Sequence, residues 1–421
     1  MNVVSRRRTA ATVAVWLLVF ASVVSWRKGV LYAGGTDPVV LAKAAVAVLA
    51  AVGAALVRRS TAAPRPFAVW PVLLVLAVVG VSLVGALADG SVAANAVLVA
   101  RIALLAGTVL TLVSTASAPS LLASMLTAMA LTGITAALTG VPAYLAGGRG
   151  RLGGGLPPLE PNEIATLLLP PAIGLMFLVV RRGVRPGPVV GLLALTGLIV
   201  ATGSRTALVM LVVAAVVMVL VERRLTAGTS ALLLVGALGA YVVLAFSSVL
   251  SELALRGEGL GQLLTLNSRT ISWSAVLETP QDTWAWWVGR GLSVKSIAVV
   301  GQYWKTQVFD SSWISSIAQD GVIGTALLAA YAVGTLVAAP RIGRVRALAA
   351  ALTITIVLRS FVENGLIESS STFTVFFTVA VLSWSASPTP RAQPRSAVTA
   401  RAAERVVRSP RELVSGSTRR H

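Results

Sequence analysis

Long apolar runs recur along the whole chain, and they limit its fold more than any other feature of the sequence. Hydrophobic residues make up 56% of the 421 residues, and only 12% are charged, whereas soluble domains carry about a quarter charged residues. Lipid offers no hydrogen-bond partners to the polar groups of the backbone, so a long apolar run crosses a membrane as a helix, in which these groups bond to one another. The sequence therefore predicts an all-α fold, a polytopic bundle of transmembrane helices over residues 1–387.

The apolar runs divide into about twelve predicted spans, separated by segments rich in glycine, proline or charge. Arginine clusters such as "RRGVRPGP" and "PRIGRVR" alternate with segments such as "ADGSV" and "ENGLIESS", which carry acids and no base. Because basic loops stay in the cytoplasm, this alternation predicts that both termini are cytoplasmic. We expect spans that begin near Thr9, Pro38, Phe67, Ala93, Pro119, Glu163, Pro188, Thr206, Thr229, Trp313, Ala347 and Thr372.

Two segments on the predicted outer side are too long to be simple turns. Residues 140–162 are rich in glycine, and residues 251–312, between the ninth and tenth spans, hold several tryptophans and arginines. Long loops of this kind are often functional, and "NSRTISWSAVLETP" in the second loop predicts a short amphipathic helix. Residues 388–421 are rich in Pro, Ser and Arg, so we expect a disordered basic tail in the cytoplasm.

The formal net charge of +20 does not indicate a nucleic-acid partner. The Lys and Arg residues cluster in short segments between the apolar runs, where membrane topology explains them. The chain has no cysteine, and its one histidine is the last residue, His421. We therefore expect no metal, no cofactor and no histidine base, so a general base would have to be a carboxylate or something rarer.

Three arginines on the predicted outer side stand out because the positive-inside rule disfavours them there. Arg205 lies in a tight turn between two spans, and Arg269 and Arg290 lie in the long loop. The guanidinium fork makes bidentate, permanently charged hydrogen bonds to phosphate. Three convergent arginines could therefore hold a pyrophosphate without a metal ion. The alternative is ordinary contact with lipid head groups or water.

Asp310 stands directly before the tenth span, in "VFDSSWISSIAQDGVIG". A carboxylate is ionised at neutral pH and can accept a proton, so Asp310 is a candidate general base. The alternative is that Asp310 caps the N-terminus of this span, because "DSSW" is a good capping sequence. The two roles are compatible with each other.

Four ionisable residues fall inside predicted spans, where charge is costly and usually functional: Lys43, Arg101, Asp320 and Arg359. Arg359 and Glu363 are four residues apart, so we expect them to pair on one helix face. The Asp320–Gly321 pair indicates a close helix crossing. Lys43 lies near a helix end, from which its ammonium could reach the interface. Arg101 has no partner nearby in the sequence, and its role stays open.

The segments "TGSRTALVMLVVA", "LNSRTISW", "VGRGLS" and "DSSWISSIAQDGVIG" occur in this order along the chain. Their order and context resemble the O-antigen ligase and O-antigen polymerase superfamily of bacterial membrane glycosyltransferases, over roughly residues 152–384. The resemblance implies a GT-C-like fold and a long outer loop between spans nine and ten. It also implies a polyprenyl-pyrophosphate-linked glycan donor, a glycan or lipid-glycan acceptor, and a place in the bacterial cytoplasmic membrane among its lipids.

The resemblance also implies roles for single residues. Arg205, Arg269 and Arg290 match the arginines that hold the donor diphosphate, and Asp310 takes the place of the base in a metal-independent, inverting transfer. Ligases typically carry "HN" where this chain has Asp310 and Ser311, and this difference favours the polymerase branch. Further residues expected to contact substrate are Asn162 and Glu163, in "EPNEIA", and Arg359.

Two other classes of function compete with this interpretation. A transporter or flippase for lipid-linked glycans would use the same arginine-lined cavity without chemistry, and Asp310→Asn would then change little. A scaffold or sensor for a cell-envelope assembly would tolerate single replacements of the outer arginines.

Overall fold

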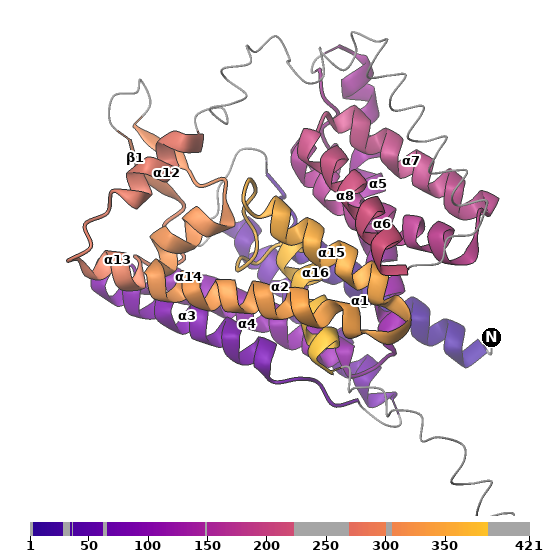
Figure 1. Ribbon diagram of the computed structural model, residues 1–421, viewed down its shortest axis with the longest axis horizontal. Helices are drawn as coiled ribbons and strands as arrows, with labels where there is room; N and C mark the ends of the chain where they lie inside the picture. Colours follow the sequence, from indigo (N-terminus) through magenta and orange to yellow (C-terminus); the bar gives the residue numbers. More distant parts are fainter. Residues whose placement is uncertain are drawn as a thin grey trace, which may run out of the picture. The chain divides into compact units, whose positions relative to one another are not determined.

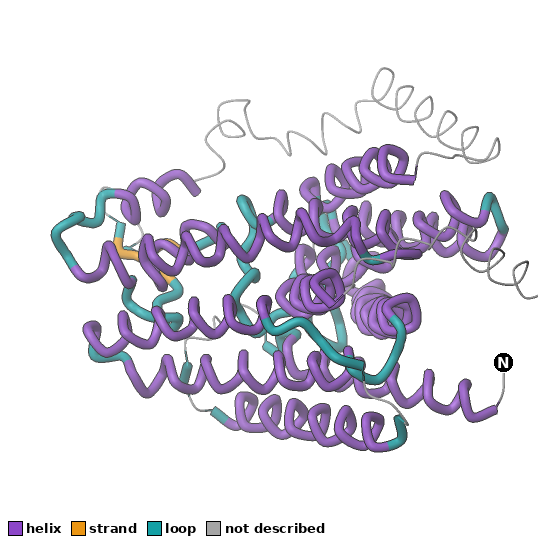
Figure 2. Tube along the Cα trace, turned by 60° about the horizontal axis from the view of Figure 1, so that its bottom comes forward, coloured by secondary structure: helices purple, strands orange, loops and turns teal. Residues whose placement is uncertain are grey.

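Helices form most of the described chain in a computed structural model (Figures 1 and 2). The structure describes residues 3–27, 34–35, 37–61, 65–147, 150–222, 269–299 and 305–385. The predicted tail, 388–421, and the predicted ninth span, near Thr229, lie outside these residues. The helices are α1 (Val3–Val23), α2 (Pro38–Arg59), α3 (Trp70–Asp89), α4 (Val92–Val113), α5 (Ala118–Leu145), α6 (Pro161–Arg182), α7 (Pro186–Thr202), α8 (Arg205–Glu222), α12 (Arg269–Leu277), α13 (Trp284–Val288), α14 (Ser312–Ala338), α15 (Arg346–Arg359) and α16 (Ser371–Ser385), with the 3-10 turns η1 (Ala339–Arg341) and η2 (Gly343–Val345).

Seven helices in the described part of the chain are long and apolar enough to cross a membrane. They are α2, α3, α4, α5, α6, α8 and α14, the last extended to Arg341; α7 and α16 are shorter apolar helices. The chain is therefore a multi-pass helical membrane protein, as predicted. Described helices begin close to eleven of the twelve predicted starts. The count of twelve complete crossings stays a prediction, because α7, α15 and α16 are short and α1 begins with an arginine cluster.

The ends of successive helices gather in two groups, as an alternating bundle requires. At one end, which we call the basic end, Arg65 N–H donates to the Ser114 carbonyl and Arg346 lies 3.8 Å from Glu222. At the other, which we call the hairpin end, Ser312 N–H donates to the Ser360 carbonyl. The α8 helix ends at the basic end, whereas α14 begins at the hairpin end. The predicted ninth span lies between them in the sequence, and a single further crossing would connect these two ends.

A two-stranded antiparallel hairpin, β1 (Ser296–Ala298) and β2 (Thr306–Val308), lies within the long predicted loop. Figure 1 shows β1 with α12 and α13 near one end of α14 and α3. The α12 helix is the amphipathic helix that the sequence predicts, and it packs on α14 and the hairpin. Its Val276 is buried with Phe309 and Ile314 in a small apolar cluster. The described part of the loop, residues 269–299 and 305–311, is therefore a folded cap on the helix ends.

A sharp kink in α14 fixes this cap to the bundle. Gly321 has φ 65° and ψ −169° inside α14, a backbone conformation that favours glycine. The kink leaves the carbonyls of Ala318 and Gln319 to accept hydrogen bonds from Arg290 N–H, at 3.0 Å, and Gly291 N–H, at 2.8 Å. A Cβ on Gly321 would lie 2.3 Å from the backbone of α13. The close crossing predicted at Asp320–Gly321 is therefore confirmed, and it explains the glycines of "VGRGLS".

Candidate functional site

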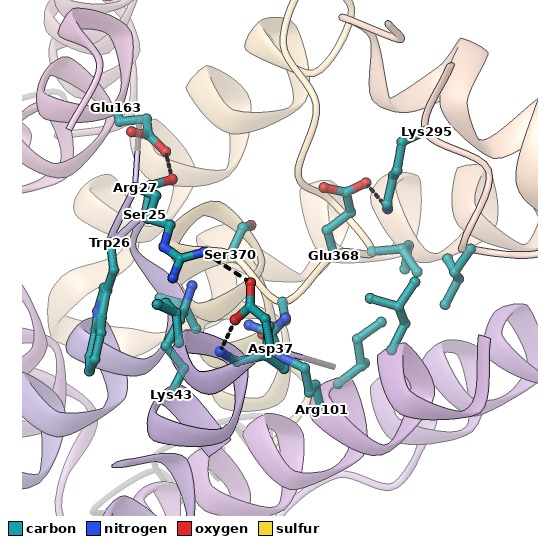
Figure 3. Close-up of a pocket in the computed structure, with 18 residues that line it drawn as sticks. Ser25, Trp26, Arg27, Asp37, Lys43, Arg101, Glu163, Lys295, Glu368 and Ser370 are labelled. Carbon is teal, nitrogen blue, oxygen red and sulfur yellow. Dashed lines mark hydrogen bonds and ion pairs between the residues drawn. The ribbon is translucent and has the colours of Figure 1, made fainter. Parts of the chain in front are cut away.

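A polar cavity of about 290 Å³ opens at the hairpin end, between helix ends that are far apart in the sequence (Figure 3). The α1–α2 connection, α2, α4, α6, the segment after α13 and the α15–α16 loop all contribute walls. Its charged and polar lining residues are Ser25, Arg27, Asp37, Lys43, Arg101, Glu163, Lys295, Glu368, Ser369 and Ser370.

Helix capping places two of the acids on one side of the cavity. The Asp37 carboxylate accepts from Val40 N–H at 2.8 Å as the N-cap of α2, and it lies 3.3 Å from Arg27. Glu163 belongs to the capping box of α6, in which its carboxylate accepts from Glu160 N–H at 2.9 Å. Caps of this kind satisfy the free N–H groups of a first helical turn, so both acids have structural roles in addition to facing the cavity.

An ion pair between the segment after α13 and the α15–α16 loop lines the other side of the cavity. Lys295 Nζ lies 2.5 Å from Glu368 Oε1, and both side chains are largely buried. The same Glu368 oxygen accepts from Asn364 Nδ2 at 3.0 Å. Figure 3 shows this pair apart from the Arg27–Asp37 pair, across the cavity. The pair ties the folded loop to the bundle.

The cavity carries more basic groups than acidic ones. Two of its acids are engaged with Arg27 and Lys295, and the third caps α6. Lys43 is half-buried, and within the described residues it makes no hydrogen bond or ion pair. The positive charge of Arg101 lies close enough to Lys43 to repel its ammonium group. The cavity is therefore suited to an anionic group.

An apolar groove of about 250 Å³ adjoins this cavity between α1, α2 and α4. The two share Lys43, Arg101 and Ser369 among their lining residues. Apart from these, the groove is lined mainly by small apolar residues, and Val48 at its edge is 51% exposed. In a membrane, an exposed apolar edge of this kind faces lipid tails.

Of the three arginines predicted to bind diphosphate, Arg205 and Arg269 begin helices, and Arg290 lies in the segment after α13. Arg290 is exposed and lines a second cavity, of about 610 Å³, together with residues of α12 and the hairpin. Arg269 is the first residue of α12, and Arg205 is half-buried as the first residue of α8, which packs on α6 and α15. The convergence of all three on one ligand stays a prediction.

Asp310 is half-buried in the two-residue link between β2 and the cap of α14. The N-cap of α14 is Ser311, whose hydroxyl accepts from Trp313 N–H at 3.3 Å. The alternative that Asp310 caps this span is therefore wrong. The backbone on both sides of Asp310 is held by hydrogen bonds. Phe309 N–H donates to the Lys295 carbonyl at 3.2 Å, and Ser312 N–H donates to the Ser360 carbonyl at 2.9 Å.

Asn162 and Arg359, expected to contact substrate, belong to a hydrogen-bonded network within the bundle, and their contact with substrate stays a prediction. Arg359 is 5% exposed, and its guanidinium donates to Thr166 Oγ1 and to the Asn162 carbonyl, at 2.5 and 3.4 Å. Its predicted pairing with Glu363 is confirmed at 3.3 Å, but the predicted shared helix face is wrong, because α15 ends at Arg359 and Glu363 lies in the loop that follows.

Arg151 extends this network to the turn that carries Arg205. It donates to Asn162 Oδ1 at 2.7 Å and to the Thr202 carbonyl at 2.8 Å. Of the three residues expected to contact substrate, Glu163 alone lines the polar cavity.

Sequence reasoning singled out Lys43 and Arg101 as unusual but did not bring them together, and it missed Lys295 and Glu368 as a pair. The available signal was the presence of ionisable residues within or beside apolar spans. Comparison with known proteins adds no identification, because no family model and no curated protein matches the chain.

Proposed function

We propose that this protein is a membrane glycosyltransferase of the O-antigen polymerase or ligase type. In this proposal twelve spans with a GT-C-like arrangement lie in the bacterial cytoplasmic membrane, with both termini in the cytoplasm and the hairpin end outside. The enzyme transfers or polymerises glycan from a polyprenyl-pyrophosphate-linked donor onto a glycan or lipid-glycan acceptor, for cell-surface polysaccharide. The order of the sequence motifs and the multi-pass helical fold support it.

The position of Asp310 is the observation that carries the proposal. The cap of α14 is supplied by Ser311, so the Asp310 carboxylate is not required for capping. Backbone hydrogen bonds to Lys295 and Ser360 hold the chain immediately before and after it. A base held on fixed elements loses little freedom when a substrate binds. Lys295 also lines the polar cavity, so one backbone hydrogen bond, from Phe309 N–H to the Lys295 carbonyl, joins the segment before the candidate base to a wall of the candidate anion site.

The reaction follows from these groups. The acceptor hydroxyl oxygen attacks the anomeric carbon of the donor sugar, and the bond from that carbon to the pyrophosphate oxygen breaks with inversion. Asp310 accepts the hydroxyl proton. The leaving polyprenyl pyrophosphate takes the electron pair, and basic groups stabilise its charge, with Arg205, Arg269 and Arg290 as the candidates.

Transfer by purified protein in lipid tests the proposal. Wild type, Asp310→Asn and Asp89→Asn would be given a polyprenyl-pyrophosphate oligosaccharide in the presence of EDTA. Asp89 is an exposed acid at the end of α3 and serves as the control for loss of one carboxylate. We expect Asp310→Asn to lower the rate by about 10²–10⁴-fold, the usual contribution of a general base, and Asp89→Asn to retain it. Full transfer by Asp310→Asn would refute the assigned base.

Transport of a lipid-linked glycan is the second candidate. One observation favours it: Asp310 is not among the residues that line the polar cavity. A transporter would move the labelled donor across the membrane of a vesicle at the same rate in wild type and Asp310→Asn, and it would leave the glycosidic linkages of the donor unchanged. That pair of results would replace the enzyme proposal.

A further inference from the structure

The polar cavity and the apolar groove meet at two basic side chains. Lys43 in α2 and Arg101 in α4 line both voids, and the third shared residue is Ser369 in the α15–α16 loop. The α2 and α4 helices pack against each other. A ligand that filled both voids would therefore have to pass these two cations.

The polar side of this junction favours an anion. Lys43 is half-buried without a hydrogen bond or ion pair in the described part of the chain. Asp37 and Glu163 act on it electrostatically from a greater distance, while each is engaged in capping a helix. A half-buried ammonium that faces this space in an apolar surrounding is costly unless an anion joins it, and the guanidinium of Arg101 lines the same space.

The apolar side of the junction favours a hydrocarbon chain. Small side chains on α2 and α4, including Ala44, Ala47 and Ala100, leave the groove open. Its volume of about 250 Å³ is below the range of about 300–1,000 Å³ typical of pockets for drug-sized ligands. A space of this size holds one stretch of a single hydrocarbon chain rather than the two chains of a phospholipid, and the rest of a long chain would leave it past the exposed edge at Val48.

We propose that Lys43 and Arg101 bind the phosphate of a single-chain lipid, with its chain in the apolar groove and its head group in the polar cavity. The proposal rests on the proposed function in taking this lipid to be the polyprenyl pyrophosphate donor or product. It assigns phosphate binding to residues other than Arg205, Arg269 and Arg290. The binding itself requires no catalysis.

Binding of undecaprenyl pyrophosphate to the full-length protein in lipid nanodiscs tests this site. We expect Lys43→Gln and Arg101→Gln each to raise Kd by at least about 10-fold, because a hydrogen bond to a charged group is typically worth that much. Lys43→Arg keeps the charge and should bind within a few-fold of wild type. Arg185→Gln removes one exposed arginine at the basic end and serves as the matched control.

Two further probes separate the parts of the ligand. Ala47→Phe places a bulky side chain in the groove, so it should weaken binding of the lipid while leaving binding of inorganic pyrophosphate unchanged. Phosphatidylglycerol, which carries two chains, should compete poorly. If inorganic pyrophosphate or phosphatidylglycerol bound as tightly as undecaprenyl pyrophosphate, the single-chain assignment would be overturned.

The binding assay also separates this site from the enzyme proposal. Asp310→Asn should bind the lipid as wild type does. If wild type binds the lipid through Lys43 and Arg101 but never transfers glycan, the site stands and the enzyme proposal fails. If neither Lys43→Gln nor Arg101→Gln changes lipid affinity in a protein that transfers glycan, the enzyme proposal stands and this site is wrong.

Discussion

Replacing Gly321 by alanine tests whether the kink in α14 holds the folded cap of α12, α13 and the hairpin in place. Gly321 has a left-handed φ, and a Cβ added there would meet the backbone of Trp287 at 2.3 Å. Carbon atoms in contact normally lie about 3.5–4.0 Å apart. Because the obstructing atom belongs to the backbone, no change of rotamer can relieve the overlap. The α13 segment would have to move away from α14.

The chain offers a matched control in Gly90, which ends α3. Gly90 has φ +75°, and no atom lies within 4 Å of an added Cβ. Gly90→Ala therefore carries only the cost of a left-handed residue, about 1–2 kcal/mol. Gly321→Ala adds overpacking of about 1–3 kcal/mol and the weakening of two hydrogen bonds to the kink, about 0.5–1.5 kcal/mol each. It should be more destabilising than Gly90→Ala by about 2–6 kcal/mol.

Thermal unfolding in detergent, followed by tryptophan fluorescence, measures this difference. A change of about 1 kcal/mol moves the midpoint by about 2–4 °C in domains of 150–250 residues, so we expect Gly321→Ala to melt several degrees below Gly90→Ala. Equal midpoints for the two variants would refute the reasoning, because Gly321→Ala adds the close approach to α13 and a backbone conformation, φ 65° and ψ −169°, that disfavours alanine more than the φ 75° and ψ 10° of Gly90. Wild type and both variants would be compared at one detergent concentration.

Two further substitutions test buried polar contacts by the same melting assay. Arg359→Met removes one partner of a buried pair and should lower the free energy of unfolding by about 3 kcal/mol. This is the lower end of the usual range, because Glu363 is still 22% exposed. An unchanged midpoint would show that this network does not stabilise the bundle. Asn95→Leu keeps the side-chain size but removes the acceptor 2.6 Å from Leu292 N–H. We expect a loss of about 1–3 kcal/mol, and a midpoint equal to wild type would show that Ser82 satisfies that donor alone.

The helical frame could be predicted from the sequence because its signals are local. Apolar runs end at prolines, glycines and charges, so most helices begin close to their predicted starts. The α12 helix followed from a short amphipathic pattern, and the Arg359–Glu363 pair followed from four-residue spacing. The hairpin was not foreseen, because three-residue strands are too short to show alternation.

The polar cavity could not be read from the sequence, because its residues are brought together only by helix packing. Lys43 and Arg101 were recognisable as charges inside apolar spans, but nothing local connects α2 with α4 or with Glu368. The assignment of the α14 cap had a different difficulty. Both Asp310 and Ser311 are good capping residues, and only the backbone conformation shows that Ser311 is the N-cap.

Lys295 links the candidate base to the candidate phosphate site. Its carbonyl accepts from Phe309 N–H, one residue before Asp310, and its ammonium pairs with Glu368 in the wall of the cavity. The α15–α16 loop that carries Glu368 is bonded in turn to the start of α14, through Ser312. Asp310 therefore follows a segment that belongs to the same hydrogen-bonded unit as the cavity wall. A donor phosphate held at Lys43 and Arg101 and an acceptor hydroxyl at Asp310 would be positioned by one rigid frame, which is what a transfer without a metal ion requires.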